Sequence, residues 1–146
     1  MNIDNHLLAL ESLSVWSCSG ACSYAFSRLP ASDTLLNSLV DHLKLSRQYQ
    51  ERFPLQLFPL DANWRPAVES FVFDWVFGAQ PSSGPGAAAQ NAVVVRELVG
   101  GIGEKVGDAA AFMVMGEGTM VPNTIWNAIA FTSAEASWLL EFGWDD

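Results

Sequence analysis

The sequence predicts an α+β fold dominated by helices, with about four to five helices and a C-terminal β-hairpin that is followed by a last helix. Apolar residues recur at helical spacing over residues 35–43 and again over 68–76. Two apolar runs at 112–115 and 124–131 are separated by turn residues, which is typical of a hairpin. Because the helical segments come first and the hairpin comes late, the order favours α+β or mostly α over an alternating α/β fold.

Two helices are expected in the first third of the chain. Residues 3–13 carry a loose stripe of leucines, which predicts a short helix. Asp33 fits the N-cap of a longer helix, whose apolar face is formed by Leu35, Leu36, Leu39, Val40 and Leu43. Between the two helices, the serine-rich residues 12–27 fit either a hairpin around Ser19 and Gly20 or a continuation of the first helix. Periodicity does not decide between these alternatives.

The middle of the chain predicts an extended segment and two more helices. Residues 53–61 contain two prolines and are expected to be extended or a loop. Pro66 suits the first turn of the next helix, and Gly78 suits its C-terminal cap. Residues 79–86 are the expected exposed loop, followed by a helix over 87–102 that a glycine-rich end loosens.

The C-terminal part predicts the hairpin and the last helix. Thr132 and Glu135 match a capping box, which would open a helix with Ala136, Leu139 and Leu140 on one face. The whole chain, residues 1–146, is expected to form a single compact domain.

Charge narrows the set of partners. The chain carries 16 acidic and 7 basic side chains, a net charge of −9, and this field repels phosphate backbones and anionic membranes. We therefore expect no direct nucleic-acid binding and no membrane association. The first ten residues lack a basic n-region, and the uncharged residues 118–134 are too short and broken to span a bilayer, so a cytoplasmic protein is expected.

No sequence motif indicates a particular catalytic reaction. Cys18 and Cys22 lie four residues apart, but His6 and His42 are not at ligand spacing, so no metal site, cofactor or catalytic residue is expected. The glycine-rich residues 100–107 match neither the Walker nor the dinucleotide-binding pattern, and we interpret them as a frayed helix end.

The last 41 residues contain no lysine or arginine, yet they hold six acidic and six aromatic residues. An indole among carboxylates suits an anchor for a basic protein partner. The predicted partner-binding residues are Glu117, Trp126, Glu135, Glu141, Trp144, Asp145 and Asp146.

In size, charge and absence of catalytic motifs the chain resembles the small acidic immunity proteins that bacteria use to neutralise toxins. The resemblance implies a non-enzymatic inhibitor that occludes a basic toxin with an acidic and aromatic surface. Two alternatives remain open. One is a secretion chaperone or adaptor that binds an effector segment, with which a homodimer is compatible. The other is a small enzyme or ligand carrier with an apolar pocket lined by aromatic residues.

Overall fold

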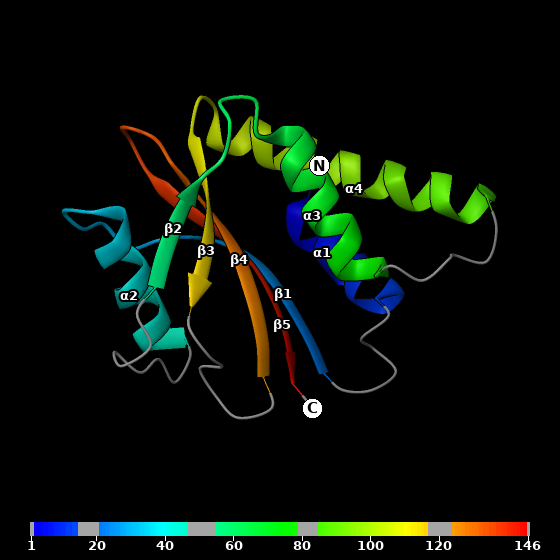
Figure 1. Cartoon of the computed structure of the whole chain (residues 1–146), viewed down its shortest axis with the longest axis horizontal. Helices are drawn as coiled ribbons and strands as arrows, with labels where there is room; N and C mark the ends of the chain where they lie inside the picture. The colour runs from blue at the N-terminus through cyan, green and yellow to red at the C-terminus, as the bar shows by residue number, and fades with distance from the viewer. Residues whose placement is uncertain (1, 15–20, 47–54, 79–84, 117–123, 146) are drawn as a thin grey trace.

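The computed structural model describes residues 2–14, 21–46, 55–78, 85–116 and 124–145 (Figure 1). The elements are α1 (Ile3–Leu13), β1 (Ala21–Arg28), α2 (Leu35–Ser46), β2 (Leu55–Pro59), α3 (Arg65–Phe77), α4 (Pro85–Val106), β3 (Ala110–Gly116), β4 (Thr124–Thr132) and β5 (Ser137–Asp145). Helices and strands alternate from α1 to α3, α4 follows, and three strands close the described part of the chain.

The five strands form one antiparallel sheet in the order β1-β5-β4-β3-β2. The three C-terminal strands are its centre, and the two edge strands come from the first half of the chain. β1 pairs with β5 from Ala21 opposite Asp145 to Arg28 opposite Trp138. The N-terminal third is therefore joined to the end of the chain by a full strand ladder.

The sheet has a different helical layer on each face. Helices α1, α3 and α4 cover one face, and α2 covers the other (Figure 1). The three-helix side holds the larger core, in which Trp64 packs edge-on against Phe131 with ring centroids 4.9 Å apart. The α2 side holds a smaller core around Leu39, Leu43 and Leu139.

The predicted last helix is wrong, because residues 137–145 form strand β5. The Thr132 hydroxyl does not cap a helix but bonds the Ser137 hydroxyl across the turn, at 2.8 Å. β5 is hydrogen-bonded to a strand on each side, and a helical layer covers each of its faces: Leu139 faces α2, whereas Leu140 faces the three-helix layer, and both are fully buried. This two-sided burial needs side chains that alternate with period two, and it overrides the local capping signal. The fold is therefore organised by a five-stranded antiparallel sheet and ends on a strand rather than on a helix.

Other expected elements are present, with shifted boundaries. The undecided residues 12–27 contain strand β1, and the extended segment at 53–61 contains strand β2. The helix expected at 87–102 runs from Pro85 through its glycines to Val106. Residues 79–84 of the expected loop lie outside the described part of the chain.

The N-cap of α2 is Thr34 rather than Asp33. The Asn37 amide donates to the Thr34 hydroxyl at 3.1 Å, the usual N-cap to N3 bond. By contrast, Gly78 does close α3 as predicted, since it takes a φ of 67° that glycine adopts without strain.

Both edges of the sheet are blunted. β2 is short and ends on Pro59, which has no backbone N–H to offer another strand. On β1, the Tyr24 N–H points away from β5 and donates to the Glu11 carboxylate of α1, at 2.9 Å. A side chain from α1 thus occupies a hydrogen-bonding position that an added strand would need.

Candidate functional site

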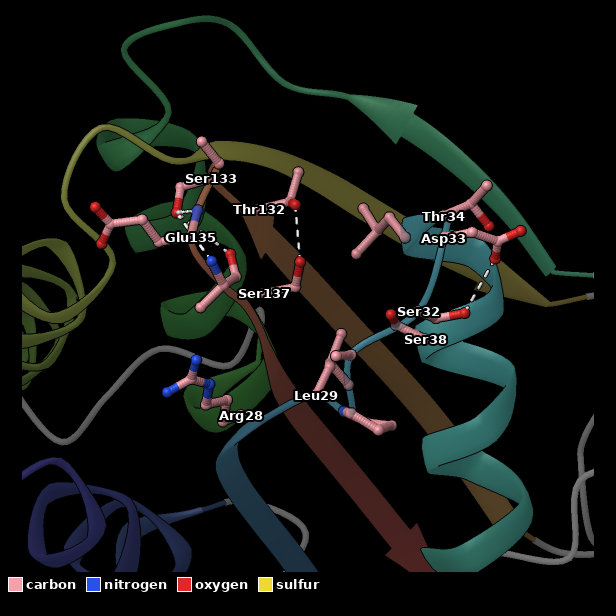
Figure 2. A pocket seen from close by; sticks show the side chains of 15 residues that line it. Arg28, Leu29, Ser32, Asp33, Thr34, Ser38, Thr132, Ser133, Glu135 and Ser137 are labelled. Atoms are coloured by element: carbon pink, nitrogen blue, oxygen red, sulfur yellow. Dashed lines mark hydrogen bonds between the residues drawn. The ribbon is translucent and has the colours of Figure 1, made fainter.

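A pocket of about 300 Å³ opens at one end of the sheet, on the α2 side (Figure 2). Its walls are the segment that links β1 to α2 and the turn between β4 and β5. We refer to it as the hydroxyl pocket, because six lining residues carry a hydroxyl group: Ser32, Thr34, Ser38, Thr132, Ser133 and Ser137.

Local hydrogen bonds shape the α2 wall. The Ser32 hydroxyl donates to Asp33 Oδ1 at 3.1 Å, and the Asn37 side-chain amide donates to the same oxygen at 2.7 Å. These two bonds favour the ionised carboxylate, with the Asn37 bond the stronger, and they lower the pKa of Asp33. Asp33 is therefore a fixed negative charge on this wall.

The opposite wall is a tight turn built by Ser133. Its hydroxyl accepts from the backbone N–H groups of Glu135 and Ala136, each at 3.4 Å. The Ser133 N–H also donates to the Ala136 carbonyl at 2.9 Å. Such serine-centred turns satisfy the backbone locally, which leaves the Glu135 side chain exposed at the tip.

Hydroxyl groups line the interior of the pocket above an apolar floor. The Thr132 and Ser137 hydroxyls bond each other on one side, and Leu29 lies buried below them. Ser38 reaches in from α2, as Figure 2 shows. The residue as a whole is only 4% exposed, but its hydroxyl is not among the buried polar atoms without a partner, so the oxygen remains accessible from the pocket.

The charges at this end are unequal. Asp33 and Glu135 are exposed on opposite walls. Arg28 borders the pocket, but its partner across β5 is Trp138, which packs on the three-helix side. Side chains opposite each other share a face, so the guanidinium of Arg28 lies on the far side of the sheet, pointing away from the pocket in Figure 2. The charged residues that border the pocket are therefore two acids, Asp33 and Glu135, and one base, Arg28, and the side chains of Glu135 and Arg28 both point outward in Figure 2.

A buried polar group lies deeper under α2, one helical turn along from Ser38. His42 Nε2 is 3.1 Å from Glu141 Oε2, and Trp126 Nε1–H donates to Glu141 Oε1 at 3.2 Å. The Glu141 side chain is only 7% exposed and that of His42 16%. We refer to these three residues as the Glu141 cluster.

Small neighbours make room for the Glu141 cluster. Glu141 lies opposite Ala25 on one side and Ala128 on the other, so no long side chain competes for the space under α2. Trp126 lies opposite Gly143, which lets its indole lean over the sheet towards the carboxylate. A buried carboxylate needs such hydrogen-bonded partners, because an unpaired one is strongly disfavoured.

The predicted partner-binding residues do not form one surface. Glu141 is buried and Trp126 half-buried, and both belong to the Glu141 cluster, so Glu141 is not the exposed charge that the sequence suggested. Trp144 is half-buried on the opposite face, opposite Ile125 and Cys22. Glu117 and Asp146 lie outside the described residues, as does the side chain of Asp145.

The acidic residues near the two ends of β5 are also far apart. Glu135 precedes the first residue of β5 and Asp145 is its last, and this strand has nine residues. At about 3.3 Å per residue the two ends of the strand are about 26 Å apart. Only Glu135 lies at the hydroxyl pocket.

Three residues at this end of the sheet were missed from the sequence: Asp33 as a site residue, Ser38 and His42. For two of these residues the sequence contains a pattern that could have identified them. Ser38 and His42 are polar, four residues apart, and lie within the apolar stripe of α2, so they face the core side of the helix. A polar pair on a core-facing stripe predicts a partner on the facing element.

Other sequence candidates acquire structural roles. Cys22 is a free, half-buried thiol on β1, and Cys18 lies outside the described residues. Residues 100–106 of the glycine-rich run are the continuous end of α4, and Gly103 lies so close to Arg65 that a Cβ there would overlap the guanidinium. Among the described residues, no group of three or more histidine, cysteine or acidic side chains is placed to hold a metal ion.

No protein-family model, curated protein or solved structure matches this chain. Within its described helices, no stretch combines the length and the apolar character needed to cross a membrane.

Proposed function

We propose that the chain is a protein-binding module that inhibits a basic partner, such as a toxin, by covering its functional surface. The proposal is supported by the balance of exposed charge. Nine exposed acids face solvent among the described residues: Asp4, Asp33, Asp41, Asp61, Asp74, Glu97, Glu104, Asp108 and Glu135. The exposed bases there are five: Arg28, Lys44, Arg65, Arg96 and Lys105.

The hydroxyl pocket is the observation that carries the proposal. It is a concave, hydrogen-bonding surface with Asp33 and Glu135 on its two walls. A convex basic element of a partner would find acceptors inside the pocket and negative charge around it. We therefore place the contact surface at this end of the sheet. Of the predicted partner-binding residues, Glu135 is the one that we retain in this contact surface.

The Glu141 cluster has a supporting role in this proposal. It ties α2 to the centre of the sheet, and α2 carries the wall with Asp33 and Ser38. Holding that wall in place before the partner arrives lowers the entropy lost on binding. Trp126 and Glu141 thus contribute through the shape of the pocket rather than by direct contact.

Electrostatics determines how such a complex would form. A net charge of −9 attracts a basic protein from a distance and raises the association rate, most strongly at low salt. Short-range contacts in the pocket would then determine the dissociation rate.

The test begins with a binding partner captured from host cells and then purified. The double variant D33K/E135K should lower the association rate at least tenfold, and raising the salt from about 0.05 to 0.3 M should slow the wild type in the same direction. The matched control is D74K/E104K, which makes the same charge change on α3 and α4 and should have the smaller effect. Equal effects of the two double variants would remove the hydroxyl pocket from the contact surface, and a rate insensitive to salt would contradict the function.

An exposed apolar patch supports the chaperone or adaptor as a second candidate. Phe58 and Met115 are 46% and 52% exposed on the same face of β2 and β3. Such a patch suits an extended apolar segment. A stable dimer that binds an unfolded peptide with little dependence on salt would favour this function. The described hydroxyl pocket does not support the aromatic-lined pocket of the third alternative, because its lining is largely polar.

A further inference from the structure

We infer that the hydroxyl pocket receives a single lysine side chain of the basic partner. The inference rests on the proposed function and names the chemical group that is recognised. Its ammonium would lie among the hydroxyl oxygens of Ser38, Thr132 and Ser137, and its apolar stem would cross Leu29 and Leu35.

Ser38 presents its hydroxyl to the pocket. The hydroxyl of Ser38 is not sealed from solvent, since it is absent from the buried polar atoms that lack a partner, and the small surface that it exposes opens on the pocket. The Ser38 residue is 4% exposed, lines the pocket, and has no hydrogen-bond partner among the described residues. Its nearest free space is the pocket, so an incoming polar group is the partner that the geometry allows.

The opposite wall supplies acceptors. The bond between the Thr132 and Ser137 hydroxyls uses one hydrogen and one lone pair, and each oxygen can accept more than one hydrogen bond. An ammonium carries three donors on a tetrahedral centre and needs several oxygens around it. The planar guanidinium of arginine is best matched by a carboxylate, and the two carboxylates stand on the rim rather than in the interior.

The acidic side chains at the pocket also favour a cation, whereas the helix dipole of α2 opposes it. The N-terminus of α2 lies at the pocket and carries about half a positive charge, which would favour an anion. Against it stand the fixed charge of Asp33 on the same wall and the charge of Glu135 at the outer rim, two full negative charges in all. The side chain of Arg28 lies on the other face of the sheet, so it does not restore the balance.

The pocket can be tested on the full chain without the natural partner. The probes are N-acetyl-lysine methylamide and N-acetyl-norleucine methylamide, which has the same stem without the ammonium. In NMR titrations at low salt, the lysine probe should shift the backbone signals of Ser38, Thr132 and Ser137 with millimolar affinity, and the norleucine probe should bind at least fivefold more weakly. Equal binding of both probes, shifts confined to other residues, or stronger shifts with inorganic phosphate would each overturn the inference.

Ser38→Ala provides a sharper comparison. It removes a hydroxyl that has no hydrogen-bond partner among the described residues, so the variant should fold with undiminished stability while its affinity for the lysine probe falls at least threefold. Ser12→Ala is the matched control, because Ser12 is exposed on α1 and away from the pocket, and it should leave the affinity unchanged. A Ser38→Ala variant that binds the lysine probe as the wild type does would refute the assignment.

The same variant separates this inference from the proposed function. If Ser38→Ala binds the purified partner unchanged while D33K/E135K does not, the acidic surface is the contact and the lysine pocket is wrong. If the lysine probe binds at the pocket but no basic protein forms a salt-dependent complex, the pocket stands and the proposed function fails.

Discussion

The carboxylate of Glu141 lies 3.1 Å from the imidazole of His42, although the two residues are 99 positions apart in the chain. This contact joins the only helix on one face of the described sheet to the interior strand β5. It also places an acidic residue next to a buried cluster that consists of leucine, valine and alanine, with Trp126 packed against it. The stability of the α2 layer should therefore depend on this pair.

His42→Ala should lower the free energy of unfolding by about 2–3 kcal/mol, because a buried carboxylate loses one of its partners. Glu141→Gln keeps an oxygen for the Trp126 N–H and should cost about 1 kcal/mol. Urea denaturation provides the measurement. Asp41→Ala, on the exposed side of α2, is the control and should stay within about 0.5 kcal/mol of the wild type. If His42→Ala is no worse than Asp41→Ala, the Glu141 cluster does not hold α2 in place.

Two glycines near the end of α4 should respond in opposite ways to alanine. Gly100 is inside the helix, and a Cβ there would meet nothing within 4 Å, so Gly100→Ala should stabilise the protein by about 0.5–1 kcal/mol. Gly107 has a φ of +62° just after the helix, so Gly107→Ala should destabilise it by about 1 kcal/mol. Thermal unfolding of the pair checks both signs. A loss of stability in Gly100→Ala would show that this residue is not in a regular helix.

Tyr24 should make the fold sensitive to alkali. Burial raises the pKa of Tyr24 well above the ordinary value of 10.0 for tyrosine, although the hydrogen bond with Ser14 opposes the shift. Because the folded state holds this proton more tightly, the stabilisation is complete below pH 10 and is lost as the pH rises from there towards the folded pKa.

Urea midpoints between pH 8 and 11 test this sensitivity, with Tyr24→Phe for comparison. The variant should lose less stability than the wild type above pH 10. All other titratable groups are the same in the two proteins, so the difference between their pH profiles reports Tyr24. Identical pH profiles would show that the Tyr24 proton is not held by burial.

Glu11 should protect the β1 edge. Its carboxylate accepts the outward N–H of Tyr24, so Glu11→Ala should free that position for another strand and promote association of the protein. Glu11→Gln retains an acceptor oxygen and should remain closer to the wild type. Light scattering during concentration measures the difference. Equal association of all three proteins would mean that Glu11 is dispensable at this edge.

Local sequence patterns predicted those elements whose type does not depend on which distant segment packs against them. The four helices were expected close to where they occur, because a one-sided apolar stripe or a proline and glycine boundary is visible in any context. The late hairpin was expected for the same reason. In the candidate site, Glu135 was expected on an exposed surface, and the turn that presents it depends on its neighbour Ser133.

Patterns that depend on two-sided burial were misinterpreted. Leu139, Leu140 and Phe142 fit a helix face as readily as a central strand, since all three are apolar and closely spaced. Glu141 stands among them, and an acid at that position usually indicates solvent. It is buried because His42 and Trp126 supply its partners.

The sequence by itself determined the helices, the hairpin and the acidic balance of the protein, because these follow from local spacing and from composition. Only the tertiary structure decided that β5 is a strand, that Glu141 is buried, and that Asp33, Ser38 and Glu135 meet at one pocket. Each of these outcomes depends on which distant segment lies alongside. A strand obtains its hydrogen bonds and its burial from neighbouring segments, and the local sequence does not identify those segments.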